Sequence, residues 1–490
     1  MPASPKTACP HNADGINLTR ANPPSRPQRT TIDTSTIPHP ARRVPFLGDI
    51  LGVSIRTPVQ DSMRMGRALG PIFARRVLGR DIVFITSAAL TAELADDSRF
   101  AKHVGVGLEQ LRPLAGDGLF TAYNAEPNWQ RAHNILMPAF TQSAMHGYHP
   151  TMLTVARQLI SSWDDSAERA TPVDVVGDMT KLTLETIGRT GFGYEFGSFD
   201  RDEVHPFVTA MVGALRFAQQ ETFLLPFMAR LRRRAIAANK RDIEFMSAEV
   251  DRVVQARRSS GADSDADLLG LMLQAADPQT GERLDEVNIR NQIITFLIAG
   301  HETTSGALGF ALYYLLKNPT ALARAQAEVD EVWGSDRDVD PTYQQVTKLR
   351  YVRRVLDEAL RLWPTAPGYA REAREDTVLD GTYRVRKGEW VMVLLPMLHR
   401  DPAVWGDPEK FEPDRFLPEN VRARSGHAFK PFGTGERACI GRQFAIHEAM
   451  LVLGLLLHRY DLHDSENYDL RVTELLTVKP DGFQMTLSRR

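Results

Sequence analysis

The longest regular pattern in the chain is a helical one that runs through residues 286–317. Apolar residues such as Ile293 and Leu297 precede its centre, and Leu308 and Leu312 follow it. At 1.5 Å per residue, such a helix is about 48 Å long and crosses a whole domain. Its middle is polar, with the run Ala-Gly-His-Glu-Thr-Thr-Ser-Gly. Polar groups inside a buried helix cost free energy unless they are partnered, so this centre is either functional or faces solvent.

The sequence on both sides of this predicted helix contains further patterns of polar and apolar residues. Residues 71–87 alternate in polarity around a Leu-Gly-Arg-Asp turn and predict a β-hairpin. Most segments in 88–374 have helical spacing, with Pro and Gly between them, and 390–395 reads as a strand. No internal repeat or Gly/Ser linker divides the chain. We therefore predict one large domain over 46–490, mainly α with small β-sheets, after a Pro-rich, disordered arm over 1–45.

Composition narrows the class of protein. The 490 residues are 43% apolar and 24% charged, an ordinary globular mixture. A net charge of −2 gives no reason to expect nucleic acid or an anionic membrane as partner. Cys9 and Cys439 are the only cysteines, which excludes a disulfide framework and fits a reducing compartment. No signal peptide and no run of 18 apolar residues is visible, so we expect a soluble, cytoplasmic protein.

The run from Phe432 to Gly441 (FGTGERACIG) carries the clearest chemistry. Its glycines allow backbone to approach a flat ligand, and backbone N–H groups stabilise a thiolate on Cys439. Arg437 can pair with a carboxylate at the ligand's edge, and a helix-like stretch follows at once, with its positive end near the sulfur. These features fit a haem iron with one axial thiolate, which favours O–O cleavage. A buried structural Cys is the alternative, whereas the G-x-G-x-x-G spacing of a dinucleotide loop is not matched.

The pattern F-x-x-G-x-R-x-C-x-G is matched at Phe432, Gly435, Arg437, Cys439 and Gly441. It resembles the thiolate loop of the cytochrome P450 family. The resemblance implies the P450 fold, with haem b between the long central helix and the Cys loop. It assigns Cys439 to the iron and Phe432, Arg437 and Gly441 to the cofactor site.

The helix centre, Ala299-Gly300-His301-Glu302-Thr303, resembles the oxygen-binding motif of the same family. By this resemblance, Ala299 and Gly300 let haem and O2 approach the backbone, and Thr303 and Glu302 deliver protons. The presence of Thr303 and Glu302 favours O2, used together with two supplied electrons, over peroxide as the source of the oxidant. The resemblance also implies electrons that come ultimately from NAD(P)H.

Two further motifs resemble parts of the family. Glu358 and Arg361 stand at i and i+3, a spacing that alone indicates only a surface ion pair. Their apolar context resembles the family's E-x-x-R motif, with Arg415 completing a structural Glu–Arg–Arg cluster. Trp129 and His133 share a helix face and stand where relatives bind a haem propionate with Trp and Arg, so the His is a departure.

Arg371 matches another propionate-binding Arg of relatives, although a lone Arg is usually a surface residue. The chain most resembles the haem domain of bacterial fatty-acid hydroxylases that are fused to a reductase, for example over 292–306 and 358–367. The sequence stops at Arg490 without a flavin or nicotinamide domain. We therefore expect a separate redox partner: a ferredoxin, a flavodoxin or a diflavin reductase.

The substrate site is expected by the same resemblance. Arg80 matches an Arg that binds a fatty-acid carboxylate, while Phe84 stands where a Tyr would be. Phe120 would lie over the haem face. The apolar channel would be lined by Leu108, Leu111, Ala115, Ala299, Ala366 and Leu476.

The expected function is O2-dependent monooxygenation of a small apolar substrate, foremost the subterminal hydroxylation of medium- or long-chain fatty acids. Three alternatives stay open. The first is a monooxygenase of a bulkier apolar secondary metabolite. The others are a peroxide-driven hydroxylase or isomerase with haem–thiolate, and a non-catalytic haem-binding carrier or sensor.

Overall fold

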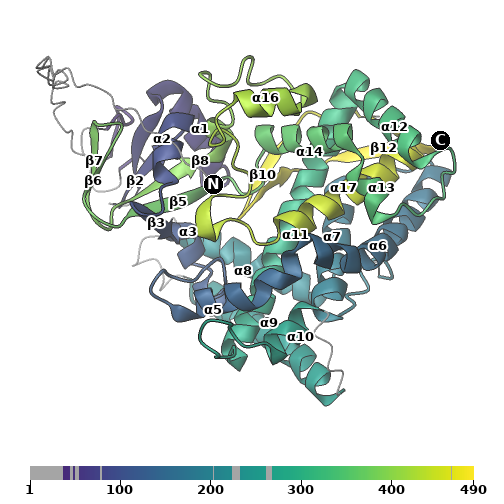
Figure 1. Ribbon diagram of the computed structural model, residues 1–490, viewed down its shortest axis with the longest axis horizontal. Coiled ribbons are helices and arrows are strands. Elements are labelled where there is room, and N and C mark those ends of the chain that lie inside the picture. Colours follow the sequence, from purple (N-terminus) through teal and green to yellow (C-terminus); the bar gives the residue numbers. More distant parts are fainter. Residues whose placement is uncertain are drawn as a thin grey trace, which may run out of the picture.

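A long helix, α11 (Glu286–Lys317), runs through the middle of the molecule, with the bounds that its sequence pattern predicts (Figure 1). The computed structural model describes residues 37–44, 48–49, 54–77, 80–201, 203–222, 232–260, 267–464 and 466–490. Residues 1–36 of the predicted disordered arm, including Cys9, lie outside this part of the chain.

Helices make up most of the described chain, as the sequence predicts. Those before α11 are α1 (Pro58–Leu69), α2 (Ala88–Leu94), α3 (Gly105–Glu109), α4 (Arg112–Ala115), α5 (Pro127–Leu136), α6 (Gln142–Glu168), α7 (Val175–Phe192), α8 (Pro206–Thr222), α9 (Arg233–Ser259) and α10 (Leu268–Gln274). Those after it are α12 (Pro319–Trp333), α13 (Tyr343–Thr347), α14 (Arg350–Leu362), α15 (Leu395–Leu398), α16 (Pro418–Ala423) and α17 (Arg442–Arg459).

The largest sheet has five strands in the order β1-β2-β8-β5-β3 and lies with α1 and α2 at one side of the molecule (Figure 1). The predicted hairpin is formed by β1 (Ile72–Val77) and β2 (Arg80–Ile85), which pair antiparallel with Ile72 opposite Ile85. Strand β8 (Trp390–Leu394) runs parallel to β2. The other strands are β3 (Phe100–His103), β4 (Val173–Asp174), β5 (Gly368–Ala373), β6 (Thr377–Leu379), β7 (Tyr383–Val385), β9 (Tyr460–His463), β10 (Val472–Glu474), β11 (Val478–Pro480) and β12 (Gln484–Arg489).

Other elements cover helix α11 on almost every side. Most of its side chains are therefore buried, and apolar residues occur all around it. It packs along α7 and also contacts α14, α17 and β11. The approach of β11 is close: a Cβ atom at Gly306 would lie only 2.9 Å from the carbonyl oxygen of Val478. This glycine therefore lets the C-terminal strands reach the centre of the long helix.

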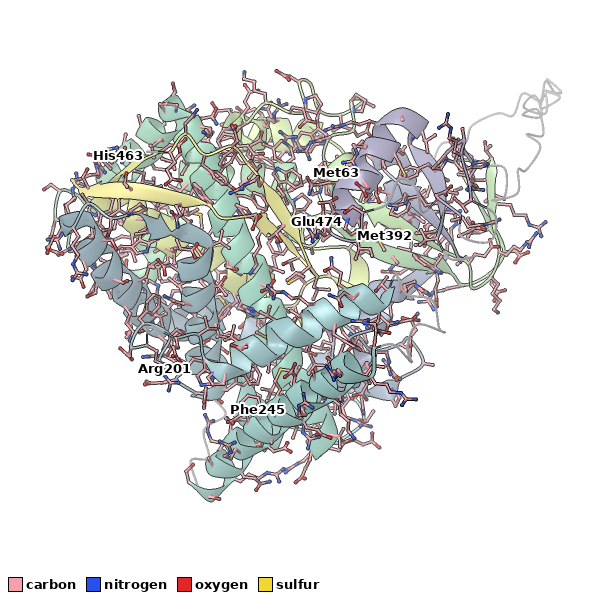
Figure 2. The ribbon with its side chains drawn as sticks, turned by 180° about the vertical axis from the view of Figure 1, so that it is seen from behind. Met63, Arg201, Phe245, Met392, His463 and Glu474 are labelled. Atoms are coloured by element: carbon pink, nitrogen blue, oxygen red, sulfur yellow. The ribbon has the colours of Figure 1, made fainter. Side chains whose placement is uncertain are left out.

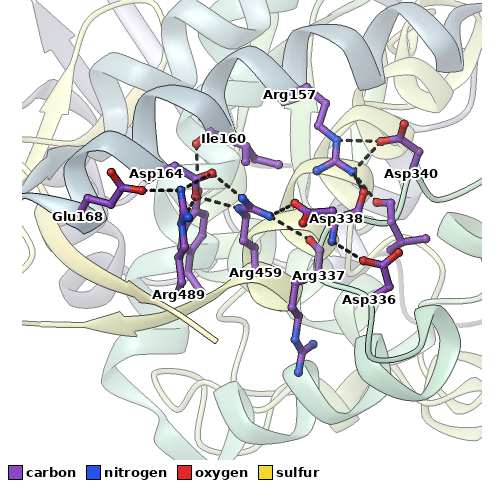
Figure 3. A network of polar contacts seen from close by, with 12 residues as sticks. Arg157, Ile160, Asp164, Glu168, Asp336, Arg337, Asp338, Asp340, Arg459 and Arg489 are labelled. Atoms are coloured by element: carbon purple, nitrogen blue, oxygen red, sulfur yellow. Dashed lines mark hydrogen bonds and ion pairs between the residues drawn. The ribbon is translucent and has the colours of Figure 1, made fainter.

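Helix α17 follows the Cys loop. Its C-terminal end is held by the network of ion pairs and hydrogen bonds in Figure 3. Arg459, its last residue, forms a 2.5 Å ion pair with Asp164 of α6 and another with Asp338. Arg489 of β12 binds the same Asp164 at 3.1 Å. One carboxylate thus joins α6, α17 and the last strand.

Within the described part of the chain, no helix combines the length and the apolar character that a membrane span requires.

Candidate active site

A cavity of about 650 Å³ lies between the sheet side and the helical side of the molecule. Residues from the beginning, middle and end of the chain line it, among them Phe84, Phe120, Thr303, Cys439 and Leu476. Its walls are mostly apolar. The sequence motifs therefore meet at one internal space.

The Cys loop holds its sulfur at the wall of this cavity. Gly433 and Gly435 have φ of 76° and 67°, which other residues rarely adopt. A Cβ atom at Gly435 would also lie 2.6 Å from a carboxylate oxygen of Asp97. The N–H of Cys439 donates to the carbonyl of Phe432 at 2.8 Å, which closes the loop. The exposed surface of the Cys439 side chain faces the cavity.

The electrostatics of Cys439 contain opposing contributions. Burial raises the pKa of the thiol, while the N–H of Gly441 and the charge of Arg442 lower it without reversing the rise. A metal cation bound to the sulfur would supply the missing stabilisation of the thiolate, because metal coordination deprotonates a thiol. The loop therefore fits a metal-bearing ligand in the cavity.

The centre of α11 forms part of the cavity wall through Ala299, Gly300 and Thr303. The hydroxyl of Thr303 donates to the carbonyl of Ala299 at 2.8 Å, a bond that turns the side chain back along its own helix. Thr303 is therefore the polar group of this motif that borders the cavity.

Glu302 points elsewhere, into a buried polar network. Its carboxylate accepts from Lys479 at 2.9 Å and from the hydroxyl of Thr477 at 3.0 Å. His301 Nε2 lies 3.1 Å from the same carboxylate. Burial alone would raise the pKa of Glu302, but Lys479 and His301 lower it well below its usual range. Thr477 also lines the cavity, so a residue bonded to Glu302 reaches the cavity wall.

Two cations near the Cys loop form no ion pair with a described carboxylate. The guanidinium carbon of Arg437 lies 4.0 Å from the ring centre of Trp129, and the ammonium of Lys102 donates to the carbonyl of Phe120 at 2.5 Å. Burial lowers the pKa of Arg437 to about 10. Burial and the neighbouring Arg437 lower the pKa of Lys102 to about 7. Both side chains line the cavity and suit the carboxylates of a ligand.

The other predicted cofactor residues also border the cavity. His133 stacks on Trp129 with ring centres 4.9 Å apart, and burial lowers its pKa. Arg371 is 3% exposed and donates to the carbonyls of Leu94 and Phe100 and to Asp97. These bonds occupy Nε and Nη2, through which Arg371 braces the loop that contacts Gly435, and its role toward a propionate stays a prediction.

The predicted substrate residues separate into three groups. Seven line the cavity: Phe84, Leu108, Leu111, Phe120, Ala299, Ala366 and Leu476. Ala115 is fully buried beside the cavity and is not part of its wall. Arg80 begins β2, but its side chain lies outside the described part of the structure.

The structure brings Glu358, Arg361 and Arg415 together in the interior. Arg361 binds Glu358 through two hydrogen bonds of 2.7 and 2.8 Å, and Arg415 approaches the same carboxylate at 3.4 Å. Arg361 also donates to the carbonyls of His399, Pro408 and Lys410, so this cluster fixes the loops before the Cys loop. None of the three lines the cavity.

The haem expected from the sequence fits this site. The cavity offers a thiol on one wall, glycine and alanine of α11 on another, and two unpaired cations at its edge for the propionates. Cys439 would hold the iron, and Arg437, Lys102, Trp129 and His133 would surround the carboxylates.

Sequence reasoning missed several of these residues. Lys102 and Thr477 lie in short segments without a motif, and Lys479 meets Glu302 from 177 positions away. The sequence also does not show which of two neighbouring arginines in β1 faces the cavity. Arg75 lines the cavity and Arg76 faces solvent, but most of β1 is buried on both faces, so its polarity pattern does not mark the inner side.

Comparison with known proteins gives one consistent result. The family model for cytochrome P450 matches residues 38–487. The bifunctional cytochrome P450/NADPH–P450 reductase of Bacillus cereus is 48% identical over 461 residues, which are 93% of this chain and 42% of that protein. The bifunctional P450/reductase 2 of Bacillus subtilis is 49% identical over 435 residues (88% and 40%).

A third relative is the self-sufficient cytochrome P450 monooxygenase CYP505U2 of Exserohilum turcicum. It is 41% identical over 456 residues, 93% of this chain and 42% of that protein. The chain thus spans about two fifths of the length of these curated relatives.

These relatives correct one expectation. The end of the sequence at Arg490 led us to expect a separate redox partner, and that expectation is wrong, because the relatives are bifunctional or self-sufficient proteins that carry their reductase themselves. A free-standing ferredoxin, flavodoxin or diflavin reductase is therefore not inferred.

The match of the family model over most of the chain agrees with the thiolate loop, the long helix and the cavity between them. The chain belongs to the cytochrome P450 family.

Proposed function

We propose that this protein is an O2-dependent haem–thiolate monooxygenase that hydroxylates medium- or long-chain fatty acids at subterminal carbons. The observation that carries the proposal is that Cys439 and Thr303 border one mostly apolar cavity. A relative at 41% identity is named a monooxygenase, which supports the reaction class.

Family membership implies haem, O2 and electrons derived from NADPH. Haem held by a single thiolate supplies the centre at which O2 is activated. The protein contributes the sulfur of Cys439 and the cations Arg437 and Lys102, which neutralise carboxylates that would otherwise be buried without partners.

Proton delivery is assigned to groups on both sides of the cavity wall. The hydroxyl of Thr303 borders the cavity and can exchange its bond to Ala299 for one to a water in the cavity. Glu302 stays ionised beside Lys479 and holds the hydroxyl of Thr477. An ionised Glu302 has no proton to give, so its part is to orient the Thr477 hydroxyl, and the proton relay itself is assigned to Thr303 and water in the cavity.

The lining of the cavity supports the proposed substrate class. Leu108, Leu111, Phe120 and Leu476 offer apolar surface that excludes water and suits a hydrocarbon chain. Each buried CH2 contributes about 0.8 kcal/mol, so affinity should rise with chain length until the cavity is filled. Phe120 is placed to limit which carbon approaches the reacting centre.

The test uses the haem-loaded protein with electrons supplied at an electrode, which removes the need for a second protein. Saturated fatty acids of graded length are added under ¹⁸O2, and products are analysed by mass spectrometry. One ¹⁸O atom in a hydroxylated acid, with a spin-state change that strengthens with chain length, supports the proposal. Hydroxylation without ¹⁸O, or turnover only with added peroxide, contradicts it.

A further inference from the structure

Arg75 is a buried cation on the wall of the cavity, and the described residues supply no counter-ion for it. It lies on β1, is 4% exposed, and lines the same cavity as Cys439. No carboxylate of the described residues forms an ion pair with it. Each of its acidic neighbours binds another arginine: Asp61 pairs with Arg64, and Asp49 pairs with Arg43.

The burial of Arg75 is therefore poorly compensated. Burial lowers the pKa of its guanidinium, and the attraction of Asp61 and Asp49 offsets only part of this effect. A buried charge costs several kcal/mol unless a partner of opposite charge and good geometry accompanies it. The site thus favours an anion that enters the cavity.

The guanidinium presents one free edge. Its Nη1 donates to the hydroxyl of Ser62 and lies 3.5 Å from the carbonyl of Pro58, and that hydroxyl donates to the same carbonyl at 2.8 Å. These contacts with α1 fix the orientation of the side chain. Its Nε is buried without a partner among the described residues, and the hydrogen bonds described for this side chain are made by Nη1. The Nε and Nη2 edge is the one through which arginine binds a carboxylate with two parallel hydrogen bonds.

The surroundings of this edge suit the first methylenes of an acyl chain. The guanidinium carbon lies 6.0 Å from the ring centre of Phe84, which stacks on Phe73. Val59, Met392 and Leu476 also line the cavity. Figure 2 shows this side of the molecule, where Met63 of α1, Met392 of β8 and Glu474 of β10 lie near one another. A hydrogen bond of 2.7 Å from the Val59 N–H to Glu474 joins α1 to β10.

We propose that Arg75 is a residue that binds the carboxylate of a fatty-acid substrate, in addition to or in place of the Arg80 expected from the sequence. The acid group then lies inside the cavity between α1 and β1, with the hydrocarbon chain directed toward Cys439. Arg75 determines the preference for acids over alcohols. This inference rests on the proposed function and specifies which group of the chain recognises its substrate.

The experiment compares dodecanoic acid with 1-dodecanol, which differ only at the polar end. Dissociation constants are measured with the haem-loaded protein by the Soret shift and checked by calorimetry. Arg75→Met removes the charge and keeps an unbranched side chain. Arg76→Met is the matched control, because Arg76 is the next residue and pairs with Asp81 at the surface. Arg80→Met tests the position predicted from the sequence.

The expected result is a loss of about 10- to 100-fold in affinity for the acid with Arg75→Met, since a charge-assisted double hydrogen bond is removed. Affinity for the alcohol should change less than about twofold, and Arg76→Met should change neither. If Arg75→Met fails to incorporate haem, Arg75→Lys is used, which keeps the charge without the planar edge and should show a smaller, still acid-selective loss.

Two failures are distinguishable. If the wild-type protein responds to the acid but Arg75→Met and Arg75→Lys bind it as the wild type does, the inference is overturned and the proposed function stands. An acid-selective loss in Arg80→Met alone also overturns it. If the wild-type protein binds no fatty acid of any length, the proposed substrate class falls, and this inference falls with it.

Discussion

The ammonium of Lys479 lies 2.9 Å from the carboxylate of Glu302, and both side chains are buried. The pair joins the centre of α11 to β11, near the point where Gly306 admits the C-terminal strands. It keeps Glu302 ionised and turned away from the cavity wall.

Replacing Lys479 should therefore be costly. Lys479→Met leaves the Glu302 carboxylate buried without its cation, and we expect a loss of about 3–5 kcal/mol in the free energy of unfolding. The double variant Glu302→Gln with Lys479→Met should recover a large part of this loss. Denaturant unfolding measures both. Lys387→Met is the control, because Lys387 forms a surface ion pair with Glu375 and its loss should be small.

Thr303 should control how electrons are used. Removing its hydroxyl in Thr303→Ala removes the proton donor at the cavity wall, and positioned proton transfer contributes about 10²- to 10⁴-fold. We expect more hydrogen peroxide and less hydroxylated product per electron passed at the electrode, with unchanged substrate affinity. Thr303→Ser keeps the hydroxyl and should keep most of the product. Equal coupling in Thr303→Ala and wild type would remove Thr303 from proton delivery.

Cys439 should determine the spectrum of the haem-loaded protein. Reduced protein under CO should show the strongly red-shifted Soret band of haem with a thiolate ligand, and Cys439→Ser should lose this band. Cys9→Ser should retain it, since Cys9 lies outside the matched family region. Retention of the band in Cys439→Ser would contradict the assignment of the iron ligand.

Glu448 should make stability depend on pH. It is 1% exposed on α17, and burial raises its pKa to about 8, with the nearby Thr186 hydroxyl offsetting a part of the rise. The folded state therefore binds a proton that the unfolded state, with a pKa of about 4.3, releases earlier. This contribution is complete below about pH 4.3 and is lost as the pH rises toward 8, at about 1.4 kcal/mol per pH unit.

Glu448→Gln should remove that slope between pH 5 and 8 while Glu419→Gln, at an exposed position of α16, should not. Unfolding free energies at several pH values measure it. A slope that persists in Glu448→Gln would show that another group takes up the proton.

Phe120 should set the position of hydroxylation. Phe120→Ala widens the cavity near the reacting centre, so we expect the distribution of hydroxylated carbons to change more than the dissociation constant of the acid. Product analysis by mass spectrometry measures the distribution. Phe245→Ala, on the outer face of α9 (Figure 2), is the control and should leave the distribution unchanged. An unchanged distribution in Phe120→Ala would indicate that a different side chain governs access.

The sequence predicted the parts of the site that depend on local spacing. The bounds of α11 follow from periodicity, and the Cys loop follows from glycines whose backbone angles other residues avoid. Local patterns could not find partners that meet only after folding. The motif places Glu302 beside Thr303, but the helix turns the two side chains in different directions, and Lys479 decides the environment of the carboxylate.

The hairpin shows a second limit. Its alternation and turn predict a β-hairpin, which the structure forms from β1 and β2. It does not tell which of two neighbouring arginines faces the cavity, because β1 is covered on both sides by other elements. Such burial depends on α1, whose position relative to β1 no local pattern encodes.

The cavity draws its walls from both ends of the chain: Arg75 comes from the first strand, Cys439 from the loop before α17, and Thr477 from a segment near the C-terminus. Contacts between such distant positions form late in folding, because closing the long loops between them costs conformational entropy before the contacts stabilise the chain. During synthesis, α11 leaves the ribosome long before the residues that complete its polar centre. Haem can therefore be captured in its final position only once Thr477 has left the ribosome, and until then the apolar flanks of α11 are exposed to aggregation.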